Sequence, residues 1–161
     1  MSLHSPSLAA VDARGLRFGV VAARFNEELV DALLDRTLET LLAAGVREKD
    51  LLLVRVPGSH EVPWAAQQLA LGGPFHCIIA LGLLIAGDTN HHEMVGDSVS
   101  HALQDVALGT GVPVINGVIV VNTLAQAKAR CAGKINRGGE FARAALEMAA
   151  LRRTFRGSKK S

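Results

Sequence analysis

The sequence has 161 residues, which is enough for a single domain with a sizeable core, and 49% of them are hydrophobic. Aromatic residues make up only 4% and the net charge is +2, so the composition indicates an aliphatic, packed α/β interior and excludes disordered and fibrous classes. Lysine and arginine form no basic face interleaved with aromatic residues, so no nucleic-acid partner is expected.

The first half of the chain predicts two strands, each followed by a helix. After a leader of residues 1–15, residues 17–23 have the composition of a short buried strand. Asn26 is a suitable N-cap for the next segment, in which apolar residues recur at three- and four-residue steps until Gly45. Residues 51–56 predict a second strand, and "PGSHEVP" breaks it and opens a second helix.

The second half continues this alternation. Residues 76–82 predict a third strand, and a long amphipathic helix is expected from about His91. Residues 111–121 predict a fourth strand, which a short helix over residues 123–130 follows. A last helix is expected over residues 140–153. The residues predicted to face inward from this helix are Phe141, Ala145, Met148 and Ala149.

The order of the elements indicates the fold class. Apolar strands that alternate with helices are typical of a parallel sheet buried on both faces. We therefore expect an α/β three-layer sandwich, with a four-stranded, mainly parallel sheet flanked by helices on both faces, as in flavodoxin-like folds. The single domain is expected to span residues 16–155, followed by a basic tail at residues 156–161.

Polar clusters follow each of the predicted strands. "RFN" follows the first strand, "PGSHE" the second, "GDTNHH" the third, and Asn122 comes directly after the fourth. In parallel α/β sheets, small ligands bind outside the carboxyl ends of the strands, where the loops enter the helices. The sequence therefore predicts one site, shared by these loops, at that edge of the sheet.

The segment "GDTNHH" has two competing interpretations. Asp88, Thr89 and Asn90 are all suitable N-caps, whose only role would be to satisfy backbone donors at the start of the helix. Alternatively, the helix start binds an anion, and His91 or His92 transfers protons near neutral pH. Adjacent histidines point in different directions on a helix and no third ligand is spaced to join them, so no metal site is expected.

Three other side chains have both a structural and a functional interpretation. Phe25 either covers the core or offers a flat face on which a heteroaromatic ring stacks. Glu61 is either a capping-box partner of Ser59 or a carboxylate that holds a polyhydroxy chain. Arg130 is either a solvated charge or a bidentate phosphate ligand. No GxxxxGK[ST] or GxGxxG motif occurs, which argues against a generic nucleotide-binding domain.

Cysteine usage and the N-terminus indicate the compartment. Cys77 and Cys131 show no metal-ligand spacing, so both are expected to be reduced thiols in a reducing compartment. The N-terminal stretch lacks the design of a signal peptide, and no apolar stretch reaches transmembrane length. A cytoplasmic protein without a membrane partner is therefore expected.

The order and spacing of these segments resemble the 6,7-dimethyl-8-ribityllumazine synthase family over nearly the whole chain. The similar stretches are "GLRFGVVAARFN", "VRVPGSHEVP", "GDTNHHEMV", "GVPVINGV" and "INRGGEFARAALEMA". The resemblance implies a transferase of riboflavin biosynthesis that condenses 5-amino-6-ribitylaminouracil with 3,4-dihydroxy-2-butanone 4-phosphate, without a metal or an organic cofactor. The implied chemistry is Schiff-base formation, phosphate elimination and ring closure, with the protein positioning the substrates and moving protons.

The resemblance also implies roles for individual residues. His91 matches the family's proton-transfer histidine. The residues that match its phosphate site are Asp88, Thr89 and Arg130. The residues that match its pyrimidine and ribityl site are Phe25, Ser59, His60, Glu61, Leu83, Leu84, Ile85 and Asn116. Of these, Asn116 falls where a neighbouring subunit closes the pocket.

Four positions depart from the family's usual pattern. His60, His92 and Asn116 stand where family members usually carry an aromatic residue, and Ala86 stands where they usually carry an arginine. Asn116 replaces apolar stacking area with a donor and an acceptor. Because His91 is retained, these departures are expected to change the affinity for the ring more than the chemistry.

The resemblance further implies an assembly. The family's sites lie between subunits of a pentamer, so a homo-oligomer is expected. The loop "CAGKINRGG" carries no extra residues, which in this family favours a 60-subunit shell of twelve pentamers, with riboflavin synthase as a candidate cargo. Two alternatives stay open: a paralogue that binds a pyrimidine or flavin with weak or no turnover, and a protein whose useful property is the shell itself.

Overall fold

The computed structural model describes residues 10–158, so the predicted leader (1–15) and basic tail (156–161) lie partly outside the described residues. The strands are β1 (Phe18–Ala23), β2 (Leu51–Val56), β3 (Cys77–Ile85) and β4 (Val114–Val121). The helices are α1 (Glu27–Ala43), α2 (Val62–Gly72), α3 (His91–Thr110), α4 (Leu124–Cys131) and α5 (Arg137–Ser158). Two 3₁₀ turns, η1 (Glu48–Asp50) and η2 (Ser59–Glu61), precede β2 and α2.

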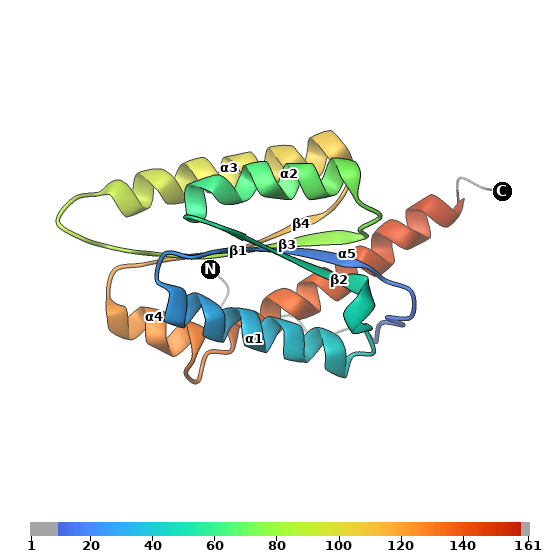
Figure 1. Cartoon of the computed structure of the whole chain (residues 1–161), viewed down its shortest axis with the longest axis horizontal. Helices are drawn as coiled ribbons and strands as arrows, with labels where there is room; N and C mark the ends of the chain where they lie inside the picture. The colour runs from blue at the N-terminus through green and yellow to red at the C-terminus, as the bar shows by residue number, and fades with distance from the viewer. Residues whose placement is uncertain (1–9, 159–161) are drawn as a thin grey trace.

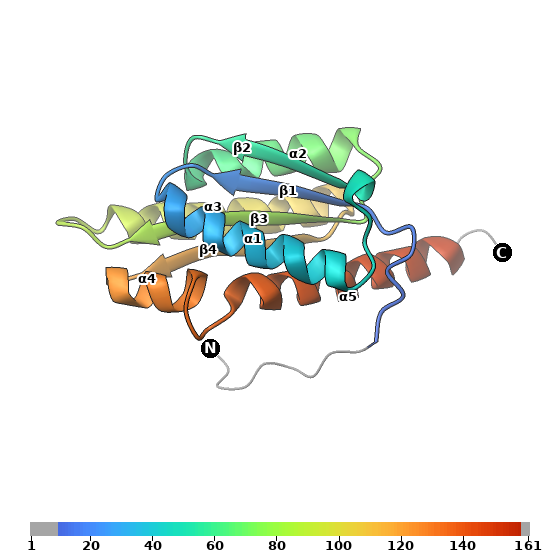
Figure 2. The same cartoon turned by 60° about the horizontal axis from the view of Figure 1, so that its bottom comes forward.

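The four strands form one sheet in the order β2-β1-β3-β4, and every pairing is parallel. Figures 1 and 2 show α2 and α3 over one face of the sheet and α1, α4 and α5 over the other. The predicted α/β three-layer fold is confirmed. After β1 the chain forms the edge strand β2, and it then returns to place β3 on the other side of β1. This reversal of strand order next to β1 is the position at which such folds bind ligands.

Successive residues of the central strands supply two separate cores. Val20 and Ala22 of β1 pack into the core beneath α1, α4 and α5, whereas Val21 and Ala23 pack into the core beneath α2 and α3. Side chains alternate between the faces of a strand, and both faces are covered by helices. This explains why β1 is apolar along its whole length and shows no polar alternation.

The last helix is longer than its sequence pattern predicts. It begins at Arg137, three residues before the expected Glu140, and it continues to Ser158. The Asn136 side chain accepts a hydrogen bond from the Gly139 N–H (2.9 Å), which caps the helix start. A Cβ on Gly138 would lie 2.5 Å from the Leu33 carbonyl oxygen, so Gly138 allows close packing against α1. The pair of glycines, Gly138 and Gly139, had indicated a loop.

The inward face predicted for this helix is partly wrong. Ala145 and Ala149 are fully buried and Phe141 packs against the core, but the Met148 side chain is 39% exposed. The buried hydrophobic positions of this helix are 142, 145, 146 and 149, and at about 100° per residue position 148 lies roughly 110° from the middle of that face.

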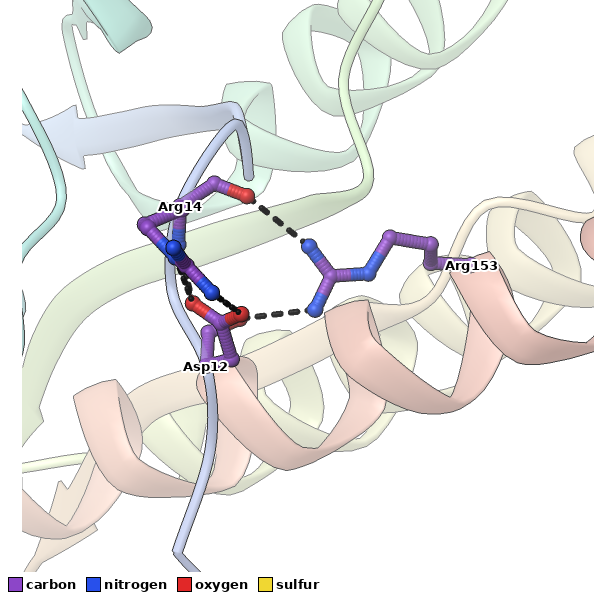
Figure 3. Close-up of polar contacts among 3 residues, drawn as sticks. All are labelled: Asp12, Arg14 and Arg153. Atoms are coloured by element: carbon purple, nitrogen blue, oxygen red, sulfur yellow. Dashed lines mark hydrogen bonds and ion pairs between the residues drawn. The ribbon is translucent and has the colours of Figure 1, made fainter.

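The chain that precedes β1 is attached to α5 by one arginine. Arg153 donates hydrogen bonds to the carbonyl oxygens of Asp12 (2.7 Å) and Arg14 (2.9 Å), as Figure 3 shows. Asp12 also pairs with Arg14, whose hydrogen bonds hold the pKa of the Asp12 carboxyl below its usual range. These contacts position residues 12–14 beside the C-terminal half of α5.

Candidate functional site

A pocket of about 440 Å³ lies at the carboxyl ends of β1 and β3, where the polar loops were predicted to converge. It is half-open to solvent and combines side chains from the β1–α1, β2–α2 and β3–α3 connections. The predicted site residues that line it are Phe25, Ser59, His60, Glu61, Leu83, Leu84, Ile85, Thr89 and His91. Three of the four predicted strand exits therefore converge within one chain, whereas Asn122, after the fourth strand, does not line the pocket.

The β1 exit presents an aromatic ring to this pocket. The Phe25 side chain is 71% exposed, which argues against its interpretation as a cover for the core. A Cβ on Gly58 would lie 3.2 Å from Phe25 Cδ2, so the ring lies close against this glycine. One face of the ring rests on the β2 exit, and the exposed remainder is available for stacking.

Asn26 connects two strand exits and does not cap its helix. Its backbone is left-handed (φ 58°), and its side chain makes no hydrogen bond to the first turn of α1. Instead, its Nδ2 donates to the Leu83 carbonyl oxygen (2.9 Å) in β3. The N-cap position was predicted correctly, but the capping bond was not. Its role in holding the β1 and β3 exits together was missed, because no local pattern reports a contact with a residue so far along the chain.

The β2 exit positions Glu61 through the backbone. Glu61 Oε2 accepts a hydrogen bond from the Gly58 N–H (2.9 Å), so Glu61 does cap the start of η2, but its partner is Gly58 and not Ser59. The Ser59 side chain is buried, its Oγ has no hydrogen-bond partner within the part of the chain that is described, and a Cβ on Gly82 would lie 2.5 Å from that oxygen. The pocket therefore contains one fixed carboxylate and one buried, unpaired hydroxyl.

The end of β3 turns backbone groups towards the pocket. Its pairing with β1 ends at the Ala22–Leu81 pair, whereas its pairing with β4 continues to Ile85. Residues 83–85 therefore have a strand neighbour on the β4 side only. The backbone groups that point to the other side lie beside the β1 exit, where Asn26 already binds the Leu83 carbonyl. This segment offers hydrogen-bonding groups to a planar ligand edge without any polar side chain.

The start of α3 presents its two histidines differently. The His91 side chain is exposed at the pocket, whereas His92 is 9% exposed and neither of its ring nitrogens has a hydrogen-bond partner among residues 10–158. The Glu93 carboxylate is 4.0 Å from His92 Nε2, which is too far for a hydrogen bond. Sequence reasoning noted His92 but gave no indication of its burial.

The capping interpretation of "GDTNHH" is supported only in part. Asn90 occupies the N-cap position but its side chain makes no capping bond, and Thr89 Oγ1 accepts only a long contact from the His91 N–H (3.4 Å). The first N–H groups of a helix have no partner within the helix. At the start of α3, the His91 N–H binds Thr89 Oγ1 and the Glu93 N–H binds the Asn90 carbonyl (3.1 Å), which leaves the His92 N–H without a hydrogen-bond partner among residues 10–158. This N–H and the helix dipole favour an anion beside Thr89 and His91.

Three predicted site residues lie outside this pocket. Asp88 is exposed in the β3–α3 connection and does not line the pocket. Arg130 lies in the last turn of α4, where it donates to the Gln126 carbonyl (3.1 Å). Asn116 is exposed on the edge strand β4, opposite Ala80, and lines a separate hollow of about 270 Å³. At ~3.3 Å per residue, it lies roughly 10–16 Å back along the sheet from residues 83–85.

The pocket also includes residues that were not predicted for it: Asn26, Gly58, Gly87, His92 and Val95. Val95 is one turn after His91 on α3 and supplies an apolar contact that helical periodicity assigned to the core. Within residues 10–158, no group of three or more His, Cys, Asp or Glu side chains is arranged to bind a metal ion.

Two further findings concern the cysteines and the helices. Both cysteines are buried free thiols, and burial raises the pKa of Cys131 to about 11. None of the described helices is long and apolar enough to cross a membrane.

Comparison with known proteins gives a consistent result. The family model for 6,7-dimethyl-8-ribityllumazine synthase matches residues 15–153. A protein of that name from Bordetella petrii is 45% identical over 141 residues, which is 88% of this chain and 79% of the relative. Relatives of the same name from Thermococcus gammatolerans (45% identical, 87% of this chain and 90% of the relative) and Aquifex aeolicus (44% identical, 89% and 94%) are similar over comparable spans.

Proposed function

The chain belongs to the 6,7-dimethyl-8-ribityllumazine synthase family, and we propose that it condenses 5-amino-6-ribitylaminouracil with 3,4-dihydroxy-2-butanone 4-phosphate in the carboxyl-end pocket. The observation that carries this proposal is the convergence of Phe25, Glu61 and His91 on one pocket in a chain that matches the family from residue 15 to residue 153. The product is 6,7-dimethyl-8-ribityllumazine, an intermediate of riboflavin biosynthesis.

The pyrimidine substrate has a binding surface that suits its two parts. Its flat ring stacks on the exposed face of Phe25 and hydrogen-bonds to the backbone of Leu83–Ile85. Its ribityl chain lies along η2, where His60 lines the pocket and Glu61 is held by the Gly58 N–H. An unpaired buried polar group costs about 1–3 kcal/mol. Ribityl hydroxyls near Ser59 Oγ and His92 would remove that cost.

The phosphate of the second substrate fits the start of α3. The His92 N–H, the positive end of the helix dipole and the Thr89 hydroxyl, which can donate its proton, all favour an anion there. The Asp88 carboxylate has the same sign of charge as the phosphate and is exposed, so its proposed contribution is through its backbone. Arg130 supplies a guanidinium to the phosphate after a rotamer change or from a neighbouring subunit.

The proposed reaction needs positioning and proton transfer. The amine of the pyrimidine attacks the ketone carbon and water leaves, which gives a Schiff base. Phosphate is then eliminated, and the ribityl-bearing amine closes the ring onto the remaining carbonyl carbon with loss of a second water. His91 stands at the pocket beside the proposed phosphate site, and its imidazole accepts and returns the protons that these steps move. No step requires a metal ion or an organic cofactor.

We also propose that the working unit is a pentamer, because Asn116 is expected to close the pyrimidine pocket of a neighbour. Asn116 is exposed on an unpaired sheet edge, which leaves it accessible to another chain. Exposed apolar side chains on α2 and α3 support an interface over that layer: Trp64, Leu71, Met94 and Leu108. The short α4–α5 connection favours a 60-subunit shell, with riboflavin synthase as a candidate cargo in the cytoplasm.

Two experiments test these proposals. Purified protein mixed with both substrates should form a product with the absorbance and fluorescence of the lumazine. Tight retention of the pyrimidine without any product would contradict the proposed activity and indicate a binding protein.

Analytical ultracentrifugation of the active protein tests the assembly. Five or sixty chains per particle are expected, and an active particle of five chains would contradict only the shell. A fully active monomer would contradict the shared site.

A further inference from the structure

A second, larger hollow lies at the opposite end of the sheet. It has a volume of about 790 Å³ and is formed by the residues before β1, the α2–β3 connection, the end of α3 and the end of α5. Its basic residues are Arg17, His76, Arg152, Arg153 and Arg156, and no carboxylate lines it. We call it the amino-end basic pocket.

Two of its arginines are held in place by backbone carbonyls. Arg153 binds the carbonyls of Asp12 and Arg14 (Figure 3), and Arg152 Nε donates to the Gly111 carbonyl (3.1 Å). The terminal N–H groups of Arg152 have no partner among residues 10–158. The Arg152 and Arg153 side chains are therefore held in place before a ligand binds, and the terminal N–H groups of Arg152 can still donate hydrogen bonds to it.

The positive charges of the other two arginines, Arg17 and Arg156, are little neutralised by nearby carboxylates. Arg156 is exposed and has no hydrogen bond or ion pair within residues 10–158. Arg17 has one carboxylate nearby, Asp50 at 3.4 Å, but this carboxylate makes its closer contact with Arg47 at 2.6 Å. Arg156 and the distal part of Arg17 therefore retain donors for a ligand.

Helix dipoles do not balance this charge. The C-termini of α2, α3 and α5 lie at this end, and each contributes about half a negative charge. Together they offset less than half of the charge of four guanidinium groups. The pKa of His76 is lowered, first by burial and then by Arg152, Arg153, Arg17 and Arg156, so the local potential is positive. Burial and Arg156 also lower the pKa of Arg152.

His76 adds a donor of known position. The ring nitrogen His76 Nδ1 accepts a hydrogen bond from the backbone N–H of Arg17 (3.0 Å), and the backbone N–H of His76 donates to the Arg17 carbonyl (2.8 Å). Because Nδ1 is occupied as an acceptor, the proton of the neutral ring is on Nε2. The ring can therefore donate to an anion without becoming charged.

We propose that the amino-end basic pocket binds a compact, multiply charged anion of the phosphate class. The donors are the terminal N–H groups of Arg17, Arg152 and Arg156 together with His76 Nε2–H. Ala70 and Phe75 also line the pocket and provide an apolar wall that an organic group on the phosphate would contact. The chemistry is the same whether the phosphate is free or carried by an organic group.

Calorimetric titration of the assembled wild-type protein with inorganic pyrophosphate, at low salt, tests this proposal. Two binding events are expected, one in this pocket and one at the proposed phosphate site of the carboxyl-end pocket. Arg156→Gln should weaken one event about tenfold, the effect of one charge-assisted contact, and Arg130→Gln should weaken only the other. Lys134→Gln, a charge-matched change in the α4–α5 connection, should weaken neither event.

The possible outcomes are distinguishable. A binding event that persists in Arg130→Gln and is weakened in Arg156→Gln supports the proposal, whatever happens at the carboxyl-end pocket. A single event that Arg130→Gln removes, or equal affinities in the wild type and Arg156→Gln, overturns the proposal and leaves the proposed enzyme activity intact. If the thermal midpoint of Arg156→Gln is no lower than that of the wild type, misfolding is excluded as the cause of its weakened pyrophosphate binding.

Adenosine diphosphate distinguishes the two sources of the anion. If adenosine diphosphate binds the Arg130→Gln variant at least several-fold more tightly than pyrophosphate does, the ligand is an organic phosphate whose organic group contacts the apolar wall. Equal affinities for the two probes would assign free phosphates. Failure of both probes to bind Arg130→Gln overturns the proposal.

Discussion

The two ends of the sheet attract anions by different means. At the carboxyl ends of the strands, the pocket is lined by Phe25, Glu61 and His91, with no arginine or lysine, and its anion site is the start of α3. At the amino ends, where α2, α3 and α5 finish, four arginines line the hollow.

This difference follows from the parallel fold. Every connection from a strand to a helix places a helix N-terminus at the carboxyl end of the sheet and a helix C-terminus at the other end. Helix N-termini hold an anion with backbone N–H groups alone, so the side chains at that end are available for ring binding and proton transfer. Helix C-termini repel anions, so that end needs a surplus of cationic side chains to bind one.

The largest expected effect is at the carboxyl end. His91→Ala should lower kcat by about 100-fold or more, because general acid–base catalysis typically contributes that much. The measurement is steady-state product formation with both substrates saturating. Lys134→Gln serves as the control and should retain wild-type kcat. A fully active His91→Ala enzyme would remove the assigned proton-transfer role.

Arg130→Ala should raise KM for the phosphorylated ketone by about tenfold or more, because it removes a charge-assisted contact to one substrate only. KM for the pyrimidine should change little. Titrating each substrate at a saturating level of the other separates the two constants. Equal weakening of both substrates would indicate a structural role for α4 and no phosphate contact.

Gly82→Ala tests the packing beneath the pocket. The new Cβ would lie 2.5 Å from Ser59 Oγ, so the expected loss is about 1–3 kcal/mol of unfolding free energy, with a raised KM for the pyrimidine. Gly87→Ala is the matched control, because its Cβ would meet no atom within 4 Å. Urea unfolding of both variants measures the difference, and equal losses would contradict the tight contact.

His92→Phe should separate stability from binding. The change removes two buried, unpartnered ring nitrogens, so the free energy of unfolding should rise by about 1 kcal/mol. KM for the pyrimidine should rise several-fold at nearly unchanged kcat, because the ligand hydroxyls lose a partner. A more stable variant with unchanged KM would show that the His92 ring does not contact the ribityl chain.

The smallest expected effect is at the amino end. The pKa of His76 is lowered in the folded protein, so the unfolded chain takes up a proton first as the pH falls below its usual value of about 6.5. Stability is therefore retained above that pH and declines below it. His76→Asn should reduce this decline, measured as thermal midpoints between pH 7 and pH 5. An unchanged pH profile would contradict the lowered pKa of His76.

The sequence predicted the pocket at the carboxyl ends of the strands better than the one at their amino ends, for a physical reason. Strand exits are marked by local changes from apolar to polar residues, and the parallel fold then brings "RFN", "PGSHE" and "GDTNHH" together. The arginines of the amino end come from positions 17 and 152–156, which are separated by nearly the whole chain. In the sequence, Arg152 and Arg153 had been placed at the end of the last helix and Arg156 in a basic tail, with nothing to indicate a shared site.

Contacts between distant segments were also unpredictable. The Asn26 side chain was expected to cap α1, a local interaction, but it binds Leu83 on another strand. The Gly138–Gly139 pair indicated a loop, because no local pattern reveals that α1 approaches so closely there. The burial of His92 likewise depends on how α3 packs against η2, which its neighbours in the sequence do not determine.

A crystal structure of the protein soaked with 5-amino-6-ribitylaminouracil tests the central claim most directly, because it shows at which end of the sheet the substrate binds. The expected result is a pyrimidine ring stacked on Phe25, with its ribityl chain extending towards Glu61 and its reactive amine on the side of His91. A substrate bound at the amino-end basic pocket, with the carboxyl-end pocket containing only solvent, would contradict the assignment of the active site.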